Sequence, residues 1–293
     1  MKIGLECIEC LIHRASVETR KATVDEELQK NVLIKVSKQL SEELNKDSVP
    51  SHLGTIRDRI IKEETKNPDP FKKDKITSNN KALEILPTIK KLIYSQRNQS
   101  LRFRKACLAS IVGNTIELGV LGHEFKYENI KSEIIRAEVD LVIDNIANIE
   151  KMIKNATNVI FLTDNAGEIV LDRLLISEIK SYGPEVTVAV KGAPISNDAT
   201  LDDVKIAGID KIADKIITTG VDSIGFIPKY CSKKFLKAFY ASDFVVAKGM
   251  AHLETLTEHK PKPPRAILLR TKCKPVANYL KADLNRNIAK LFK

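Results

Sequence analysis

The chain has 293 residues, of which 43% are hydrophobic and 29% charged, and its formal net charge is +10. This composition is typical of an ordinary soluble globular protein, and no apolar stretch approaches the length of a membrane span. A signal peptide is not expected because Glu6, Glu9 and His13 interrupt the apolar N-terminal residues, and five scattered cysteines argue against a secreted disulfide framework. We therefore expect a cytoplasmic protein that does not enter a membrane.

The positive charge is unevenly distributed along the chain. Residues 1–150 carry 25 Lys and Arg against 23 Asp and Glu, whereas the remainder carries 23 against 15. The second half therefore favours anionic partners, which include phosphorylated metabolites and nucleic acid.

The first half of the chain shows helical periodicity. Apolar residues recur at helical spacing in Asn31–Leu40, Ala82–Ile93 and Glu133–Ile143, and a polar, proline-containing stretch from Glu64 to Pro70 indicates a loop. The pattern predicts a helical domain over residues 1–155.

From Asn158 onward, strands alternate with helices. The candidate strands are Val159–Thr163, Val186–Val190, Ile216–Thr218, Phe244–Ala247 and Ala266–Leu269. Such alternation predicts right-handed crossovers and a parallel, doubly wound sheet in a second domain over residues 156–293, so the fold class is α/β.

The first of these strands leads into a turn that carries polar side chains. Asp164 and Asn165 lie where an open α/β sheet binds its ligands, and their oxygens suit a hard divalent cation. In the alternative interpretation, Asp164 caps the following helix and Gly167 relieves a tight turn.

Polar residues also follow other strands, which strengthens the functional interpretation. Lys191–Thr200 follows the second strand, Lys248–Glu254 the fourth, and Arg270–Cys273 the fifth, while Asp243 directly precedes the fourth. Carboxylates with an amide can hold Mg²⁺ or Mn²⁺, and lysines can hold a phosphate.

Three familiar kinds of phosphate site are not expected, because the sequence lacks their motifs. The sequence contains neither a P-loop nor a dinucleotide-binding glycine fingerprint. An aspartyl-phosphate mechanism of the haloacid dehalogenase type would need a second Asp at position 166, where this chain has Ala166.

Three other features of the sequence could form sites. Cys7-x-x-Cys10-x-x-His13 has metal-like spacing, which Cys107 or Cys273 would have to complete through the fold, so buried, inert cysteines are the preferred interpretation. Gly113-Asn114 indicates a helix break, and His252 and His259 are expected on the surface or in a substrate loop.

These motifs, taken in order, resemble the DUF89 family of metal-dependent damage-control phosphatases, in its archaeal and bacterial branch. The resemblance rests on Asp-Asn-Ala-Gly-Glu after a strand, Asn-Asp-x-Thr, Lys-Gly-x-Ala before Glu-Thr-Leu, and Lys-Cys-x-Pro-Val-Ala. It implies a helical domain packed on a Rossmann-like, three-layer α/β/α domain.

The resemblance also implies a site. Asp164, Asn165 and Asp198 would hold Mg²⁺, Mn²⁺, Co²⁺ or Ni²⁺, and Glu168 matches an acid of the ligand pocket. The resemblance places substrate contacts on Lys248 and Lys272, and the segments around the strands add Lys191, Asn197, Asp243 and Gly249 as candidate substrate-binding residues. His252 stands where the family usually has Asn, and Glu117 where Asp is usual, so both bear on substrate identity.

Asp198 has two acidic neighbours that spacing alone would allow as the third ligand. Asp198 belongs to the strand-end loop, whereas Asp202 and Asp203 fall in the first turn of a helix expected to begin near Leu201, where acidic residues complement the helix dipole. Asp198 is therefore the predicted ligand.

The sequence thus predicts hydrolysis of a phosphomonoester of a small metabolite, either a sugar phosphate or a damaged phosphorylated cofactor. A divalent metal would supply Lewis-acid activation, Lys248 and Lys272 would neutralise charge on the phosphoryl oxygens, and Glu168 or Asp243 would handle the proton.

Two alternatives from other classes remain, and the oligomeric state stays undetermined. One is a carboxyl methyltransferase that uses S-adenosylmethionine, although its cofactor would favour a first loop richer in glycine. The other is a nucleic-acid-binding protein, for which the aromatic residues near Lys229–Lys237 would be the contact; their helical spacing favours a place in the core, so we do not expect nucleic acid to be the partner.

Overall fold

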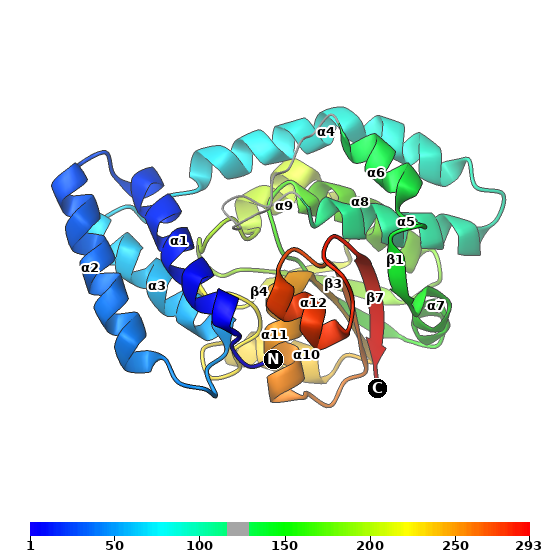
Figure 1. The fold of residues 1–293 in the computed structure, drawn as a ribbon. Coiled ribbons are helices and arrows are strands. Elements are labelled where there is room, and N and C mark those ends of the chain that lie inside the picture. The colour runs from blue at the N-terminus through cyan, green and yellow to red at the C-terminus, as the bar shows by residue number, and fades with distance from the viewer. Residues whose placement is uncertain (116–128) are drawn as a thin grey trace.

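The computed structural model describes residues 1–115 and 129–293, and it shows a helical part beside a seven-stranded sheet (Figure 1). The helices of the first half are α1 (Leu5–Ala22), α2 (Glu26–Glu43), α3 (Pro50–Thr65), α4 (Lys72–Tyr94), α5 (Gln99–Gly113), α6 (Ile130–Arg136) and α7 (Ile146–Lys154). Those of the second half are α8 (Glu168–Lys180), α9 (Leu201–Ala207), α10 (Lys233–Tyr240), α11 (Gly249–His259) and α12 (Lys274–Leu280). The strands are β1 (Leu141–Asp144), β2 (Asn158–Leu162), β3 (Glu185–Val190), β4 (Lys215–Thr218), β5 (Phe244–Lys248), β6 (Arg265–Arg270) and β7 (Asn287–Phe292).

Helices α1 to α3 form a small unit with a core of its own. Apolar residues at helical spacing, such as Val32, Val36 and Leu40 on α2, meet Leu11 and Leu53 of the neighbouring helices. Asp25 begins α2 because its Oδ1 accepts hydrogen bonds from the backbone amides of the first turn. The helices predicted over Asn31–Leu40 and Ala82–Ile93 are confirmed as parts of α2 and α4.

The sheet has the strand order β1-β7-β6-β5-β2-β3-β4, in which every pairing is parallel except that of β6 with β7. The five strands predicted from the sequence are β2 to β6, each within one residue or so of the expected bounds. The mainly parallel, doubly wound sheet and the α/β class are confirmed.

The sequence did not predict strands β1 and β7, and one predicted helix was wrong. The helix expected over Glu133–Ile143 ends at Arg136, and residues Leu141–Asp144 form the edge strand β1 instead. Strand β1 pairs with β7 near the other end of the chain, and the periodicity of a local segment does not reveal such a pairing. Because β1 lies in the sheet, residues 1–155 are not wholly helical, and the division of the chain at residue 155 stays a prediction.

The sheet is buried on both faces, which gives three layers. Val159 and Phe161 of β2 join the core under α5 and α8, while Ile160 and Leu162 join the core under α10, α11 and α12. This explains why the strand is a continuous apolar run rather than an alternating one. Helices α1 and α3 lie beside the carboxyl-terminal ends of the parallel strands (Figure 1), where they contribute to the pocket described below.

Candidate active site

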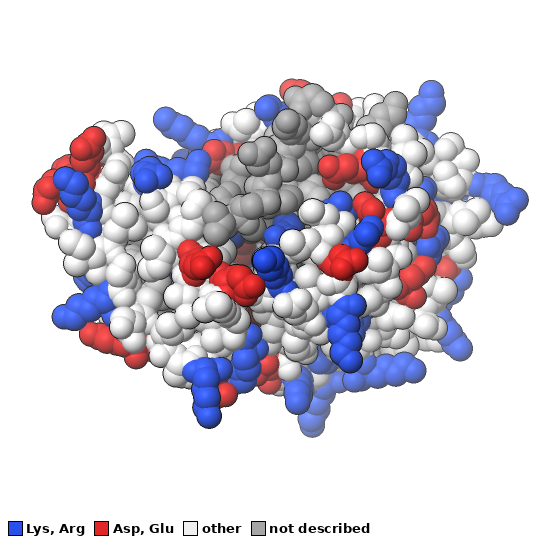
Figure 2. All heavy atoms as spheres, in the orientation of Figure 1, with Lys and Arg blue, Asp and Glu red and all other residues white. Residues whose placement is uncertain are grey.

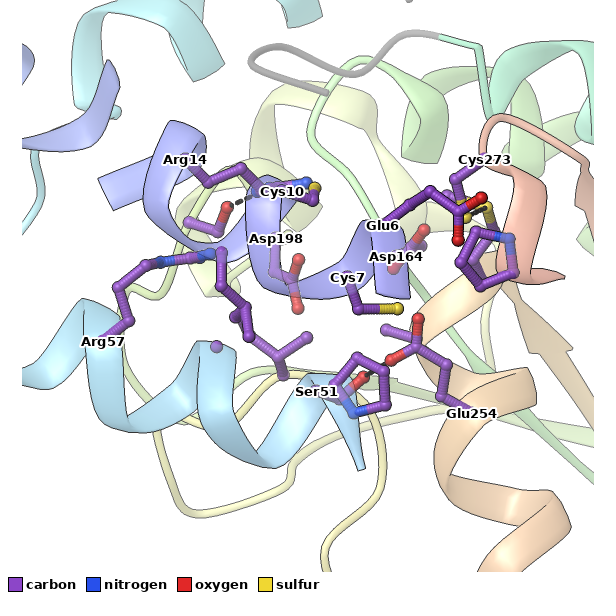
Figure 3. A pocket seen from close by; sticks show the side chains of 18 of the residues that line it. Glu6, Cys7, Cys10, Arg14, Ser51, Arg57, Asp164, Asp198, Glu254 and Cys273 are labelled. Atoms are coloured by element: carbon purple, nitrogen blue, oxygen red, sulfur yellow. Dashed lines mark hydrogen bonds between the residues drawn. The ribbon is translucent and has the colours of Figure 1, made fainter. Parts of the chain in front are cut away.

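The turn after β2 presents the first two candidate ligands. Gly167, with φ of 79°, is the residue before α8, and its amide donates to Asn79 Oδ1 at 2.7 Å. Gly167 thus relieves the turn as expected. Asp164, three residues earlier, is not the cap of α8; its carboxylate is directed into the pocket (Figure 3).

The loop after β3 is joined directly to this turn. Ala199 N donates to Asp164 O at 2.8 Å, Ala166 N donates to Asn197 O at 2.9 Å, and Asn165 and Asp198 form an isolated antiparallel bridge. The parallel pairing of β2 with β3 brings the two loops to the same edge. The three candidate metal ligands therefore lie together, as the strand-end argument predicts.

Asn114 belongs to this site although the sequence indicated only a helix break there. Helix α5 does end at Gly113, so the break is confirmed. However, Asn114 Nδ2 donates to Asp164 Oδ2 and to Glu168 Oε2, both at 2.9 Å. Lys272 Nζ donates to the backbone oxygen of Asn114 at 2.7 Å and so fixes the end of the helix. The only signal in the sequence for this role is the polar side chain of Asn114 within an apolar run, and that pattern does not indicate where the side chain points.

Gly249 allows β5 to approach the turn closely. A Cβ at this position would lie 1.8 Å from Asp164 Oδ2, and the glycine has φ of +82°. A side chain here would therefore clash with a candidate ligand as well as strain the backbone.

We expect Gly249→Ala to lower the free energy of unfolding by clearly more than Gly183→Ala, measured by urea denaturation. Gly183 has φ of +108° with no atom within 4 Å of the added Cβ, so its substitution isolates the backbone strain, about 1–2 kcal/mol. Equal losses for the two variants would contradict the assigned contact between Gly249 and Asp164.

Lys248 and Glu168 form a buried charge cluster behind the turn rather than part of the pocket wall. Both side chains are fully buried; Lys248 Nζ is bonded to Glu168 Oε1, to Asp172 Oδ1 at 3.0 Å and to Ser110 O at 2.9 Å. Glu168 Oε2 accepts from Asn114 and from Asn165 Nδ2 at 3.1 Å. Burial raises the pKa of Asp172 to about 7, although Lys248 opposes this. Direct substrate contact by Lys248, as expected from the sequence, does not fit this position.

Of the other candidates, Lys191, Asn197 and Lys272 lie near the site and Asp243 does not. Lys191 Nζ is 3.3 Å from Asp198 Oδ2 and donates to Gly225 O at 3.0 Å. Asp243 precedes β5 at the opposite edge of the sheet, where its exposed carboxylate accepts from the amides of Thr157 and Asn158 at 2.9 and 2.8 Å. The candidacy of Asp243 for substrate or proton handling was wrong because it lies at the amino end of its strand.

The position of His252 differs from the expectation, whereas Cys7 is buried as expected. His252 is buried, with Nδ1 2.7 Å from Lys248 O, and burial lowers its pKa to about 3, so its expected surface position was wrong. Burial raises the pKa of Cys7 to about 11. In the described part of the chain, no three His, Cys, Asp or Glu side chains are arranged to hold a metal, which includes Cys7, Cys10 and His13. Glu117 lies outside the described residues.

A pocket opens at this edge of the sheet. It encloses about 120 Å³ between α1, α3, α11 and α12, and Asp164, Asn165 and Asp198 lie on its wall. Figure 3 shows side chains that line it, among them Cys7, Arg14, Ser51, Arg57 and Glu254; of these, Arg14, Ser51 and Arg57 were not candidates from the sequence. Cys7, Cys10 and Arg14 share one face of α1 through their spacing of three and four residues, which was the available signal.

Arg14 brings positive charge to the pocket wall. Its Nη2 donates to Ser196 Oγ at 2.9 Å, in the loop that also carries Asp198. Ser196 has φ of 46°, so this loop is held in a left-handed conformation beside the candidate ligand.

The oxygen donors fit a divalent metal. The expected set contains two carboxylates, Asp164 and Asp198, and the amide of Asn165, so a cluster of three acidic, histidine or cysteine ligands is not required. Two charged oxygens and one neutral oxygen, with room in the pocket for further ligands, match the preference of Mg²⁺ and Mn²⁺.

The neighbours of Asp198 lie outside the pocket. Thr200 and Asp203 form a capping box at the start of α9, in which Thr200 N donates to Asp203 Oδ2 at 2.8 Å. Asp202 is exposed in the same turn. The helix expected near Leu201 is confirmed, and Asp202 and Asp203 belong to it.

Charged side chains of both signs are mixed on one face of the molecule. On the face shown in Figure 2, Lys and Arg side chains are spread around the outline with Asp and Glu between them. Phe235 and Phe239 are buried in the core under α10, as their spacing predicted, although Tyr240 is exposed. Among the described helices, none is long and apolar enough to cross a membrane.

Comparisons with known proteins cover nearly the whole chain. Residues 3–288 match the model of the damage-control phosphatase ARMT1-like domain. The chain is 38% identical to an uncharacterised protein of Methanocaldococcus jannaschii, over 98% of this chain and 95% of that one. It is 35% identical to a damage-control phosphatase of Archaeoglobus fulgidus, over the full length of both.

A solved structure agrees with these matches. The crystal structure of a DUF89 family protein from Pyrococcus horikoshii superposes with a TM-score of 0.86 at 31% identity, and it covers 100% of both chains. The resemblance stated from the motifs is therefore confirmed: the chain belongs to the ARMT1-like, or DUF89, family of damage-control phosphatases.

Proposed function

We propose that this protein is a divalent-metal-dependent phosphatase that hydrolyses phosphomonoesters of small metabolites at the pocket between α1, α3 and the sheet. The observation that carries the proposal is the meeting of Asp164, Asn165 and Asp198 at one end of a small pocket. Family membership supports phosphate ester hydrolysis as the chemistry. The cytoplasmic location expected from the sequence stays a prediction.

The proposed site contains two groups of residues: those that would bind the metal, and those that hold these metal ligands in place. A metal bound by Asp164, Asn165 and Asp198 would supply Lewis-acid activation of the phosphate ester. Asn114 orients Asp164 through a hydrogen bond, Lys272 holds Asn114 by donating to its backbone oxygen, and Lys191 lies against Asp198. Such outer contacts fix the direction of the ligating oxygens.

Arg14 is the proposed contact for the phosphate, in place of the buried Lys248. It reaches the pocket wall beside Ser196, two residues from Asp198. A guanidinium recognises the oxygens of a phosphate through paired hydrogen bonds. The remaining wall is largely apolar and includes Leu11, Ile224 and Met250, which suits the organic part of a small ester.

We expect chelation to abolish phosphate release and Mn²⁺, Co²⁺, Ni²⁺ or Mg²⁺ to restore it, because a site of oxygen donors exchanges its metal readily. The measurement is the release of inorganic phosphate from a panel of sugar phosphates and phosphorylated cofactors after exhaustive chelation and after each metal is returned. Release that continues unchanged in the chelated protein would contradict the metal dependence. Methyl transfer from S-adenosylmethionine in place of phosphate release would favour the methyltransferase alternative.

A further inference from the structure

Glu254 is a carboxylate on the pocket wall that belongs neither to the proposed metal ligands nor to the proposed phosphate contact. It lies on α11, one of four acidic residues on the pocket wall together with Glu6, Asp164 and Asp198. Ser51 Oγ of α3 donates to Glu254 Oε2 at 2.5 Å, which fixes the orientation of the carboxyl group. In Figure 3 its other oxygen points away from Ser51 into the pocket, on the side of Asp164.

Neither residue that the sequence offered for proton transfer suits that task. Both oxygens of Glu168 are occupied by Lys248, Asn114 and Asn165, and the side chain is fully buried behind the turn. Asp243 lies at the opposite edge of the sheet. The hydrolysis of an alkyl phosphate nevertheless benefits from a proton donor, because an alkoxide is a poor leaving group.

The surroundings of Glu254 favour its protonated form. Burial raises its pKa, against the opposing effects of Ser51, the amino group of Met1 and Arg14. The titratable groups around it are Met1, Glu6 and Cys7 at the start of the chain, Arg14 of α1, Asp164 and Asp198 on the pocket wall, and Cys273 beside α12. A carboxyl group whose pKa is raised still carries its proton when an ordinary glutamate has lost it.

We propose that Glu254 is the general acid of the reaction and donates its proton to the oxygen of the leaving group. The inference rests on the proposed phosphatase function. In this step the oxygen of water forms a bond to phosphorus, the bond from phosphorus to the ester oxygen breaks, and that oxygen takes the proton of Glu254 and departs as an alcohol. One proton of the water stays on the phosphate product, and the other returns through solvent to Glu254. Ser51 is a positioning residue that holds the carboxyl group in this orientation.

The test compares esters whose leaving groups differ in their need for a proton. We expect Glu254→Gln to lower kcat about 10²- to 10⁴-fold for the alkyl phosphate of the panel that the protein hydrolyses fastest. With 4-nitrophenyl phosphate, whose leaving group departs as a stable anion, we expect a loss of less than about tenfold. The decrease of kcat as the pH rises through the pKa of Glu254 is also expected to disappear in this variant.

Two matched variants make the result specific. Glu84→Gln changes an exposed carboxylate of α4 that does not line the pocket, and is expected to keep the wild-type leaving-group dependence and pH profile. Glu6→Gln tests the other pocket glutamate. Equal losses of Glu254→Gln on both esters, or a selective loss in Glu6→Gln instead, would overturn the assignment while the phosphatase function stands. A wild-type protein that releases phosphate from no ester would contradict the proposed function itself.

Discussion

Substitution of Asp198 by Asn is expected to lower metal-dependent phosphate release about a thousandfold while the fold is retained. The change keeps the size of the side chain but removes one of the two negative charges in the proposed ligand set, and loss of metal activation costs several kcal/mol of transition-state stabilisation. The loop should keep its shape because its backbone bonds, such as Asp198 N to Ile195 O at 3.1 Å, do not involve the carboxylate. The measurements are initial rates at saturating Mn²⁺, metal affinity by calorimetry and far-ultraviolet circular dichroism.

Asp202→Asn is the matched control for this experiment. Asp202 is exposed in the first turn of α9, so its loss should cost about 0.3–1 kcal/mol of stability and leave the rate unchanged. Asp203 is a different case, because Asp203 Oδ1 also accepts from Asn79 Nδ2 at 2.7 Å and Asn79 in turn holds Gly167 N. Its substitution should cost about 0.5–2 kcal/mol of stability, with the turnover of the folded protein preserved. A normal rate for Asp198→Asn with an inactive neighbour would move the metal site elsewhere.

Substitution of Lys248 by Met is expected to destabilise the protein by about 3–5 kcal/mol at pH 7, the typical effect of breaking a buried ion pair. Lys248 Nζ is the cation between Glu168 and Asp172, and all three side chains are fully buried. Its removal leaves two carboxylates in the interior without a compensating charge. The free energy of unfolding is to be measured by urea denaturation.

The pH dependence of this variant gives a second, independent readout. The pKa of Asp172 is already raised to about 7 with Lys248 present, and it should rise further without the lysine. Protonation then removes the buried charge, so the folded state binds more protons than the unfolded state and the loss of stability should shrink as the pH falls from 8 to 5. Lys151→Met, an exposed lysine of α7, should change stability by no more than about 0.5 kcal/mol at every pH. A loss in Lys248→Met that does not vary with pH would contradict the assigned charge cluster.

The position of Lys248 shows that a residue of a motif need not have the role that the motif suggests. Lys248 and Glu168 were singled out because they follow strands, and the structure does bring them to the same edge of the sheet. Whether Lys248 faces a ligand depends on how α5 and α8 pack, because Ser110 and Asp172 of these helices accept hydrogen bonds from its ammonium group. Spacing along the chain contains no information about that contact.

The sequence by itself determined the five strands β2 to β6, the turn at Asp164–Gly167 and the meeting of Asp164, Asn165 and Asp198. Parallel strands buried on both faces are continuous apolar runs, and their carboxyl ends share one edge, so local pattern and a general rule of α/β sheets were sufficient. The same reasoning placed Asp202 and Asp203 on a helix, where the structure has them.

Only the tertiary structure decided the rest of the site. Asn114 reaches Asp164 from the end of α5, and Arg14, Ser51 and Glu254 come from three helices that local periodicity could identify but not orient. Strand β1 became recognisable only through its pairing with β7. The physical reason is common to these cases: which side chains share a pocket depends on packing between segments far apart in sequence, and a spacing pattern within one segment does not specify that packing.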